Sequence, residues 1–195
     1  MKMIVRMRSI IPFTTSMTQL PHTRSCFVCG DHNPLGLNLR FETDGTMVHC
    51  RFVPRPEHAG FKETLHGGIT ATILDEVMVW VVGVRTKSFA YCAEMSIRYA
   101  LPGKPGTPLI ATARLTQNRR QKLFETESEM RTETGALIAS ATGKYLPIPG
   151  KLAFAALADF TGGDPGFEWM MGVSPVPADL KSEVPNLKSP GSDAS

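Results

Sequence analysis

The strongest hydrophobic pattern in the chain lies at residues 65–83, where apolar side chains occupy nearly every face of a predicted helix. Because such a helix has almost no polar stripe, the rest of the protein must cover it, and we expect it at the centre of the fold. It begins with Gly67 and Gly68, which leave backbone N–H groups approachable, and it carries the adjacent carboxylates Asp75 and Glu76. Burial of an unpaired carboxylate is costly, so Asp75 is either a functional acid or an ordinary buried acid held by a partner group.

Alternation of apolar and polar residues predicts β-strands on both sides of this helix. A hairpin is expected over residues 37–53, with Asp44 and Gly45 at its turn. Simple alternation in the first strand after the helix places Cys92 on the face opposite Met95. Four longer strands are expected there, at residues 89–101, 109–116, 123–132 and 136–146. This order predicts an α+β fold, in which a highly curved antiparallel sheet wraps around one long central helix.

The two ends of the chain differ in composition from this body. Residues 1–20 combine basic residues with a broken apolar run, and we expect them to be disordered. Residues 21–149 are expected to form the folded domain. Residues 150–195 are rich in Pro, Gly and Ser and are expected to be partly disordered. Four aromatic residues in that segment are able to pin parts of it to the body: Phe154, Phe160, Phe167 and Trp169.

The formal net charge of +3 is too small to indicate a nucleic-acid partner. The basic excess is confined to residues 1–30, which hold four basic residues and no acid, so the folded body is close to neutral. No segment resembles a secretory signal, and the central helix is expected to be too short and too charged to span a membrane. Four cysteines are too few for a disulfide scaffold. These features favour a cytoplasmic protein that binds neither nucleic acid nor membranes.

Cys26 and Cys29 are spaced as two thiolates that bind tetrahedral zinc. One such pair is half of a site, although His32 follows closely. His49 and Cys50 are adjacent on a predicted strand and therefore point to opposite faces. We expect the two cysteines to pack a tight turn and the protein to bind no metal, with a zinc-bound interaction module as the alternative.

Three motifs follow one another along the chain: Cys26-Phe27-Val28-Cys29-Gly30 with Asn33-Pro34-Leu35-Gly36-Leu37, then His66-Gly67-Gly68 with an acid nine residues after the histidine, then Glu94-Met95-Ser96-Ile97-Arg98-Tyr99. Together they resemble the hotdog-fold acyl-CoA thioesterases, in particular the phenylacetate-degradation (PaaI-like) and 4-hydroxybenzoyl-CoA thioesterase group. The likeness covers about residues 24–147. The His-Gly-Gly triplet alone is a weak signal, whereas the triplet, the acid at this spacing and this strand order are together fairly specific.

The resemblance implies roles for residues of the central helix. The backbone N–H groups of Gly67 and Gly68 would stabilise the oxyanion that forms when a thioester carbonyl is attacked, and the first glycine is the family's usual donor. Asp75 matches the catalytic acid and would act either as general base on water or as direct nucleophile. His66 is expected to cap or shape the loop by hydrogen bonds. Glu76 lies about 100° round the helix from Asp75, so we interpret it as structural.

Other positions are implied to contact the substrate. Cys92 stands where related enzymes often carry a Ser or Thr that faces the scissile group from the partner subunit, and a thiol hydrogen-bonds more weakly than a hydroxyl. A nucleophilic Cys92 is an outside alternative. His58 either lines the substrate cleft or is a solvated loop histidine. A basic corner formed by Arg119, Arg120 and Lys122 would hold the phosphates of coenzyme A, with a solvated hairpin tip as the alternative.

We therefore predict an acyl-CoA thioesterase that releases free acid and coenzyme A, needs no cofactor, and assembles as a homodimer or a dimer of dimers. One alternative is an acyl-CoA-binding protein that has lost turnover, a reading favoured by Cys92. Another is a hotdog hydratase or dehydratase, but those enzymes use an Asp/His pair that has no counterpart we can place in this chain.

Overall fold

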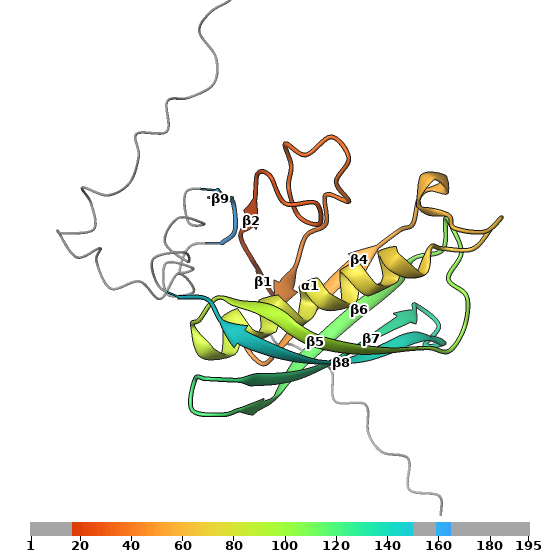
Figure 1. The fold of residues 1–195 in the computed structure, drawn as a ribbon. Coiled ribbons are helices and arrows are strands. Elements are labelled where there is room, and N and C mark those ends of the chain that lie inside the picture. The colour runs from red at the N-terminus through yellow and green to blue at the C-terminus, as the bar shows by residue number, and fades with distance from the viewer. Residues whose placement is uncertain (1–16, 150–158, 165–195) are drawn as a thin grey trace, which may run out of the picture.

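The apolar stretch forms α1 (Gly67–Thr86), a helix that lies across one face of a curved antiparallel sheet (Figure 1). The computed structural model describes residues 17–149 and 159–164. The other elements, in chain order, are β1 (Thr18–Gln19), β2 (His22–Thr23), β3 (Glu42–Thr43), β4 (Met47–Phe52), the 3₁₀ turn η1 (Pro56–His58), β5 (Ala90–Tyr99), β6 (Leu109–Asn118), β7 (Phe124–Thr132), β8 (Leu137–Pro147) and β9 (Phe160–Thr161).

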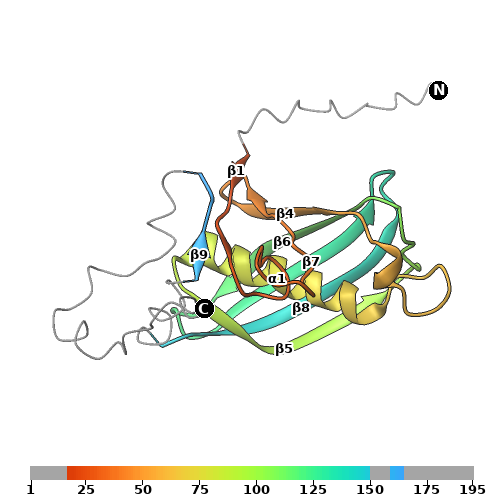
Figure 2. The ribbon, with the colours of Figure 1, turned by 90° about the horizontal axis from the view of Figure 1, so that it is seen from above.

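Within the described residues, seven strands form one sheet in the order β1-β3-β4-β6-β7-β8-β5, and each neighbouring pair is antiparallel. The ten-residue strand β5 follows α1 and lies at one edge, where it pairs with β8 alone. Seen from above, α1 runs over the middle strands and β5 lies along one side (Figure 2). The predicted α+β hotdog architecture is therefore confirmed.

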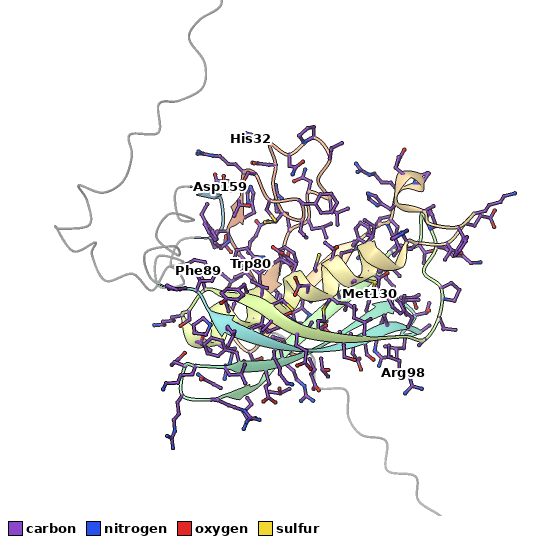
Figure 3. The ribbon with its side chains drawn as sticks, viewed as in Figure 1. His32, Trp80, Phe89, Arg98, Met130 and Asp159 are labelled. Carbon is purple, nitrogen blue, oxygen red and sulfur yellow. The ribbon has the colours of Figure 1, made fainter. Side chains whose placement is uncertain are left out.

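The sheet wraps α1 because the facing side chains are apolar. Ile73, Val77 and Val81 of the helix are fully buried. Met130 of β7 lies between helix and sheet, whereas Arg98 of β5 points away from the helix (Figure 3). The core is thus a single layer of side chains between one helix and the concave face of the sheet.

By length and composition alone, α1 is apolar enough to cross a membrane, contrary to the expectation that it is too short and too charged. The helix extends three residues beyond the predicted stretch, to Thr86. More than half of its most apolar window is buried inside the fold, as is usual for the core helix of a globular domain.

The predicted hairpin at residues 37–53 is shorter than expected. Its turn at Asp44 and Gly45 is present, with Gly45 at φ +85°, but β3 comprises only Glu42–Thr43. Upstream of β3 the backbone bonds elsewhere: the N–H groups of Leu37 and Leu39 donate to the carbonyls of Phe27 and Val28. The segment is therefore buried against the 26–29 turn instead of pairing with β4.

A β-bulge corrects the predicted alternation of β5. The register against β8 shifts between Cys92 and Glu94, so the extra residue, Ala93, is left exposed. Cys92 consequently lies on the same half-buried face as Met95 and not opposite it.

Two short pairings extend the folded body beyond the predicted boundaries. Within residues 1–20, the described residues 17–20 are ordered, since β1 pairs with β3 and Leu20 is fully buried. At the other end β9 pairs with β2, and the Phe160 ring lies 5.9 Å from the Trp80 ring and 5.4 Å from the Phe89 ring, between ring centroids. Phe160 is thus pinned to the body as predicted; the rest of the predicted set lies outside the described residues: Phe154, Phe167 and Trp169.

Candidate active site

The first turn of α1 leaves one backbone N–H group open. His66 caps the helix in an extended conformation, and its Nδ1 accepts a hydrogen bond of 2.9 Å from the N–H of Gly68. The N–H groups of Ile69 and Thr70 both donate to the His66 carbonyl. The N–H of Gly67 has no acceptor among the described residues. Gly68 does not present a second open N–H group, contrary to the expectation from the resemblance.

The local geometry explains the second glycine of the helix but not the first. A Cβ at Gly68 would lie 2.9 Å from His66 Nδ1, so a side chain there would displace the capping ring. A Cβ at Gly60 would lie 2.9 Å from Cδ2 of the same ring. At Gly67 the nearest atoms to a Cβ belong to the Tyr99 ring, at 3.5 Å, which is ordinary contact. The first glycine is therefore distinguished by its open N–H at the positive end of the helix dipole.

A cavity of about 450 Å³ opens beside this N–H group. Its wall includes the side chains of Phe61, Tyr99 and Leu101, which are 84%, 54% and 51% exposed. The Tyr99 hydroxyl donates a 2.9 Å hydrogen bond to the Gly67 carbonyl, which fixes the first helical peptide. An apolar cavity with one N–H donor in its lining suits a ligand that has a carbonyl group and an apolar chain.

The Asp75 carboxylate lies further along α1, against β8 and β5. Its Oδ1 accepts a 2.7 Å hydrogen bond from the hydroxyl of Tyr145, a fully buried residue of β8. Cys92 is the β5 residue paired with Tyr145 and interacts with both groups. Burial and the Asp75 charge raise the pKa of the Cys92 thiol, and the same two causes raise that of the Tyr145 hydroxyl. Cys92 is therefore a protonated thiol beside the acid of its own chain, which argues against a nucleophilic role.

The sequence alone does not mark Tyr145 as a functional residue. It occupies an inward position of the predicted strand 136–146, where an apolar residue is the default. One available signal was Gly143, two residues earlier on the same face, because a Cβ there would lie 2.5 Å from the Tyr145 ring. A glycine that makes room for a buried tyrosine indicates that the ring has a fixed position.

The two halves of the predicted site do not meet within one chain. Gly67 and Asp75 are eight residues apart on the same helix, and eight residues of α-helix rise about 12 Å. The Gly67 N–H and the Asp75 carboxylate therefore cannot both touch one carbonyl group of a substrate bound to a single copy.

His58 and Glu76 lie apart from both halves. His58 is buried, stacked on Phe52 at 5.4 Å, and does not line the cavity, so the reading as a solvated loop histidine is wrong. Its Nδ1 accepts from the Arg55 N–H at 3.1 Å, and burial followed by the Arg55 charge lowers its pKa. Glu76 faces the 26–29 turn and accepts a 3.2 Å hydrogen bond from Nε1 of Trp80.

The predicted basic corner is the β6–β7 turn. Its three cations, Arg119, Arg120 and Lys122, are all exposed, and Arg119 pairs with Glu125 at 2.6 Å. In Figure 1 this turn lies at the end of the sheet where α1 finishes, away from Gly67. Within one chain the corner and the open N–H group are thus at opposite ends of the helix.

The thioesterase superfamily model matches residues 62–139, which span α1 and β5 to the start of β8. A putative esterase of Caenorhabditis elegans is 36% identical over 105 residues, which are 53% of this chain and 61% of that protein. Human acyl-coenzyme A thioesterase 13 is 29% identical over 93 residues, which are 47% of this chain and 66% of that protein. The chain thus spans less than two thirds of the length of these curated relatives.

Solved structures show the same architecture. A thioesterase superfamily protein superposes with a TM-score of 0.57 at 26% identity, over 63% of this chain and 60% of that chain. The PaaI protein from the phenylacetic acid degradation operon of E. coli superposes with a TM-score of 0.53 at 17% identity, over 58% of this chain and 81% of that chain. A Streptococcus mutans protein bound to acetyl-CoA superposes with a TM-score of 0.50 at 20% identity, over 53% of this chain and 82% of that chain. The last two likenesses concern the fold alone.

Proposed function

We propose that the protein hydrolyses acyl-CoA thioesters to a free acid and coenzyme A, a proposal supported by the match of residues 62–139 to the thioesterase superfamily model. The observation that carries the proposal is the open Gly67 N–H at the start of α1, beside an apolar cavity. A preorganised N–H donor of this kind stabilises the oxyanion of a tetrahedral intermediate, and one donor typically contributes a factor of about 10²–10³ in rate.

A second copy of the chain completes the site. The edge strand β5 offers ten residues of backbone for pairing, and antiparallel pairing of two β5 strands is compatible with twofold symmetry. If the pairing is centred near Met95 and Ser96, Cys92 of one copy lies opposite Tyr99 of the other. Cys92 adjoins Asp75, and Tyr99 is bonded to Gly67. This register therefore sets the carboxylate of one copy close to the open N–H of the second.

The same symmetry gives the basic corner a role. Because such a twofold axis would reverse the direction of α1, the corner of one copy would lie at the end where α1 of the other begins. Arg119, Arg120 and Lys122 are then able to bind the phosphates of coenzyme A while the thioester reaches the site between the copies. The acyl group enters the cavity lined by Phe61 and Leu101.

The reaction proceeds by attack on the thioester carbonyl. Asp75, oriented by Tyr145, accepts a proton from water as the water oxygen bonds to the carbonyl carbon. The oxyanion accepts the hydrogen bond from the Gly67 N–H. Collapse of the intermediate breaks the carbon–sulfur bond, and the proton on Asp75 passes to the coenzyme A thiolate. Direct attack by the Asp75 carboxylate, followed by hydrolysis of the anhydride, is the alternative route to the same products.

A non-catalytic acyl-CoA-binding protein is the second candidate function. Cys92 favours it, because the thiol beside Asp75 is a weaker hydrogen-bonding group than the hydroxyl that the resemblance leads us to expect. Binding without turnover would leave the cavity and the basic corner in use and Asp75 idle.

The test is the release of free thiol from short, medium, long and aryl acyl-CoAs by the wild type and the variant Asp75→Asn. Asparagine keeps the shape of the side chain but is neither a base nor a nucleophile, so kcat should fall by about 10²-fold or more. Glu133→Gln, which alters an exposed carboxylate at the β7–β8 turn, is the matched control and should retain wild-type kcat.

Two results would overturn the proposal. An active wild type matched by an equally active Asp75→Asn variant would remove the assigned acid. A wild type that binds acyl-CoA in a direct binding assay but releases no thiol from any substrate would establish the binding function instead.

A further inference from the structure

The Cys26-x-x-Cys29-Gly30 sequence folds as a tight turn whose backbone faces a sulfur atom. The N–H of Val28 donates to Sγ of Cys26 at 3.2 Å, and the N–H of Gly30 donates to the Cys26 carbonyl at 2.9 Å. A Cβ at Gly30 would lie 2.3 Å from that carbonyl oxygen, so the turn requires glycine there. Backbone N–H groups aimed at a cysteine sulfur favour its thiolate form, which is the form that binds metal.

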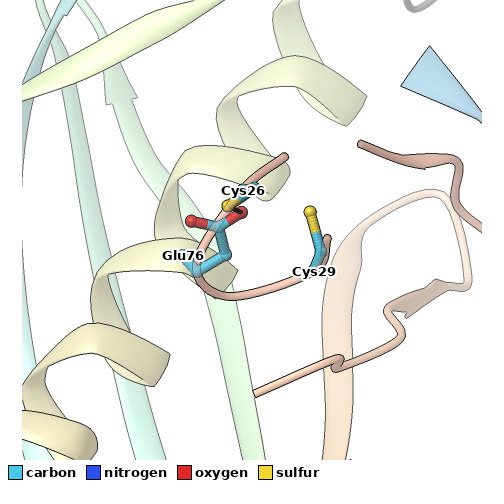
Figure 4. A group of neighbouring side chains, drawn as sticks. All are labelled: Cys26, Cys29 and Glu76. Carbon is cyan, nitrogen blue, oxygen red and sulfur yellow. Dashed lines mark hydrogen bonds between the residues drawn. The ribbon is translucent and has the colours of Figure 1, made fainter. Parts of the chain in front are cut away.

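The fold brings a carboxylate from α1 to this turn. The two sulfur atoms and one carboxylate oxygen of Glu76 all lie within 4.8 Å of one another (Figure 4). Cys29 is 1% exposed, and the Glu76 side chain is half-buried between the turn and the helix. The second sulfur is also bonded: the N–H of Thr23 donates to Sγ of Cys29 at 3.5 Å. Three ligand atoms of the types that zinc prefers thus converge from two elements.

Glu76 is a half-buried carboxylate without a basic partner among the described residues. Its hydrogen-bond donors are Nε1 of Trp80 and, at 3.9 Å, the thiol of Cys26. A divalent cation at this point would supply the missing positive charge.

We propose that Cys26, Cys29 and Glu76 bind one zinc ion, with a water molecule as the fourth tetrahedral ligand. Thiolates select zinc over magnesium and calcium, and the single carboxylate supplies an oxygen that zinc also accepts. Zinc–sulfur bonds of about 2.3 Å put the two sulfur atoms about 3.8 Å apart, a separation compatible with ligand atoms that already lie within 4.8 Å of one another. The proposal takes up the zinc alternative that the Cys-x-x-Cys spacing left open.

The ion holds the turn against α1. Glu76 directly follows Asp75, so the site fixes the helix next to the proposed catalytic acid without touching the substrate. Binding of the ion would therefore add to the stability of the fold, as structural zinc does generally. The zinc site does not depend on the proposed thioesterase activity, because Glu76 points about 100° around the helix from Asp75 and the zinc ligands do not include the Tyr145 contact.

The test is the metal content of the tag-free full chain, purified under reducing conditions, saturated with zinc and dialysed. The wild type should retain about one zinc ion per chain, and Cys26→Ser, Cys29→Ser and Glu76→Gln should each bind zinc more than about 100-fold more weakly, exceeding the loss that outer-shell changes cause. Cys50→Ser, which alters a buried cysteine outside the cluster, is the matched control and should retain the ion.

Two measurements on the wild type keep the proposal testable if a ligand variant fails to fold. Cobalt(II) added to the metal-free chain should give the thiolate charge-transfer and visible bands of a tetrahedral site. Zinc should also protect Cys26 and Cys29 from alkylation while Cys92 reacts at an unchanged rate. The proposal would be overturned if the wild type retained less than about a tenth of a zinc ion per chain. It would also be overturned if the three ligand variants folded and bound zinc as tightly as the wild type.

Discussion

The Asp75 carboxylate owes its orientation to one buried hydroxyl. Tyr145 is fully buried on β8, and its 2.7 Å hydrogen bond to Oδ1 is the contact that fixes the side chain. A hydrogen bond to a charged acceptor contributes about 1.5–3 kcal/mol. Tyr145 is therefore a positioning residue for the proposed reaction, although it never touches the substrate.

The variant Tyr145→Phe should lower kcat by about ten- to a hundredfold and leave KM unchanged, because the ring still fills its space while the carboxylate loses its orienting bond. Steady-state kinetics with the best substrate of the acyl-CoA panel measures both constants. Thr126→Val is the matched control, since it removes a buried hydroxyl that has no hydrogen-bond partner. An unchanged kcat in Tyr145→Phe would contradict the positioning role.

Single residues differ in how far the sequence predicts them. Asp75 and His66 are predictable because each lies at a fixed spacing within one helix and its cap. Tyr145 and the cluster around Glu76 are not, because their partners are 70 and 50 residues away in sequence. Such contacts depend on strand register and on the path of the 26–29 turn, neither of which has a local signal.

The start of α1 shows how an element presents one backbone group. Gly67 occupies the first helical position, its N–H bonds to nothing in the described chain, and His66 before it has φ −61° and ψ 130°. Proline is favoured at the first helical position, and it requires an extended residue before it. The helix is therefore able to accept proline there, with loss of only this N–H group.

The variant Gly67→Pro should fold with near-wild-type stability but lose about 10²–10³-fold in kcat, because it removes the oxyanion donor. Gly67→Ala keeps the N–H and adds a Cβ in ordinary contact with Tyr99, so it should lose far less activity. Thermal unfolding and steady-state kinetics on the two variants separate stability from catalysis. Equal activity in both variants would show that the Gly67 N–H is not the donor.

Most strands and the helix are predictable because their periodicity matches their burial, whereas β3 and β5 show where periodicity misleads. Leu37, Leu39 and Phe41 alternate like a strand and are buried like one. Their backbone does not pair with β4: Leu37 and Leu39 bond to the 26–29 turn, and the Phe41 carbonyl accepts from the N–H of Leu20. In β5 the bulge at Cys92 inverts the faces halfway along the strand. An apolar pattern reports which side chains are buried and not which backbone they pair with.

At the scale of the whole molecule, the proposed site needs two copies of the chain. The 12 Å rise estimated from Gly67 to Asp75 separates the donor and the acid in one copy. The exposed rings of Phe61 and Tyr99 beside the cavity, and the unpaired edge of β5, are the surfaces that a second copy would cover. Each dimer then holds two sites, and every site takes its acid from one copy and its N–H donor from the other.

Hybrid dimers test this arrangement. Asp75→Asn and Gly67→Pro chains, coexpressed with different tags and purified through both, should show about half of the wild-type activity, because one of the two sites receives both intact groups. Each variant purified alone should be nearly inactive. A hybrid containing one chain with both substitutions and one chain with Asp75→Asn is the control and should stay inactive. Failure of the first hybrid to regain activity would contradict a shared site.

The pairing of β2 with β9 also determines the order in which the chain can finish folding. His22 bonds opposite Thr161, and Ser25 donates to Asp159, so these contacts close a loop of well over a hundred residues. Such closures are entropically costly and form late. During synthesis, the segment at residues 22–25 leaves the ribosome early but waits for almost the whole domain before it docks. Residues 22–25 are thus synthesised among the first but reach their final contacts among the last. A nascent chain that ends before Asp159 would lack the β2–β9 pairing and the Ser25–Asp159 hydrogen bond.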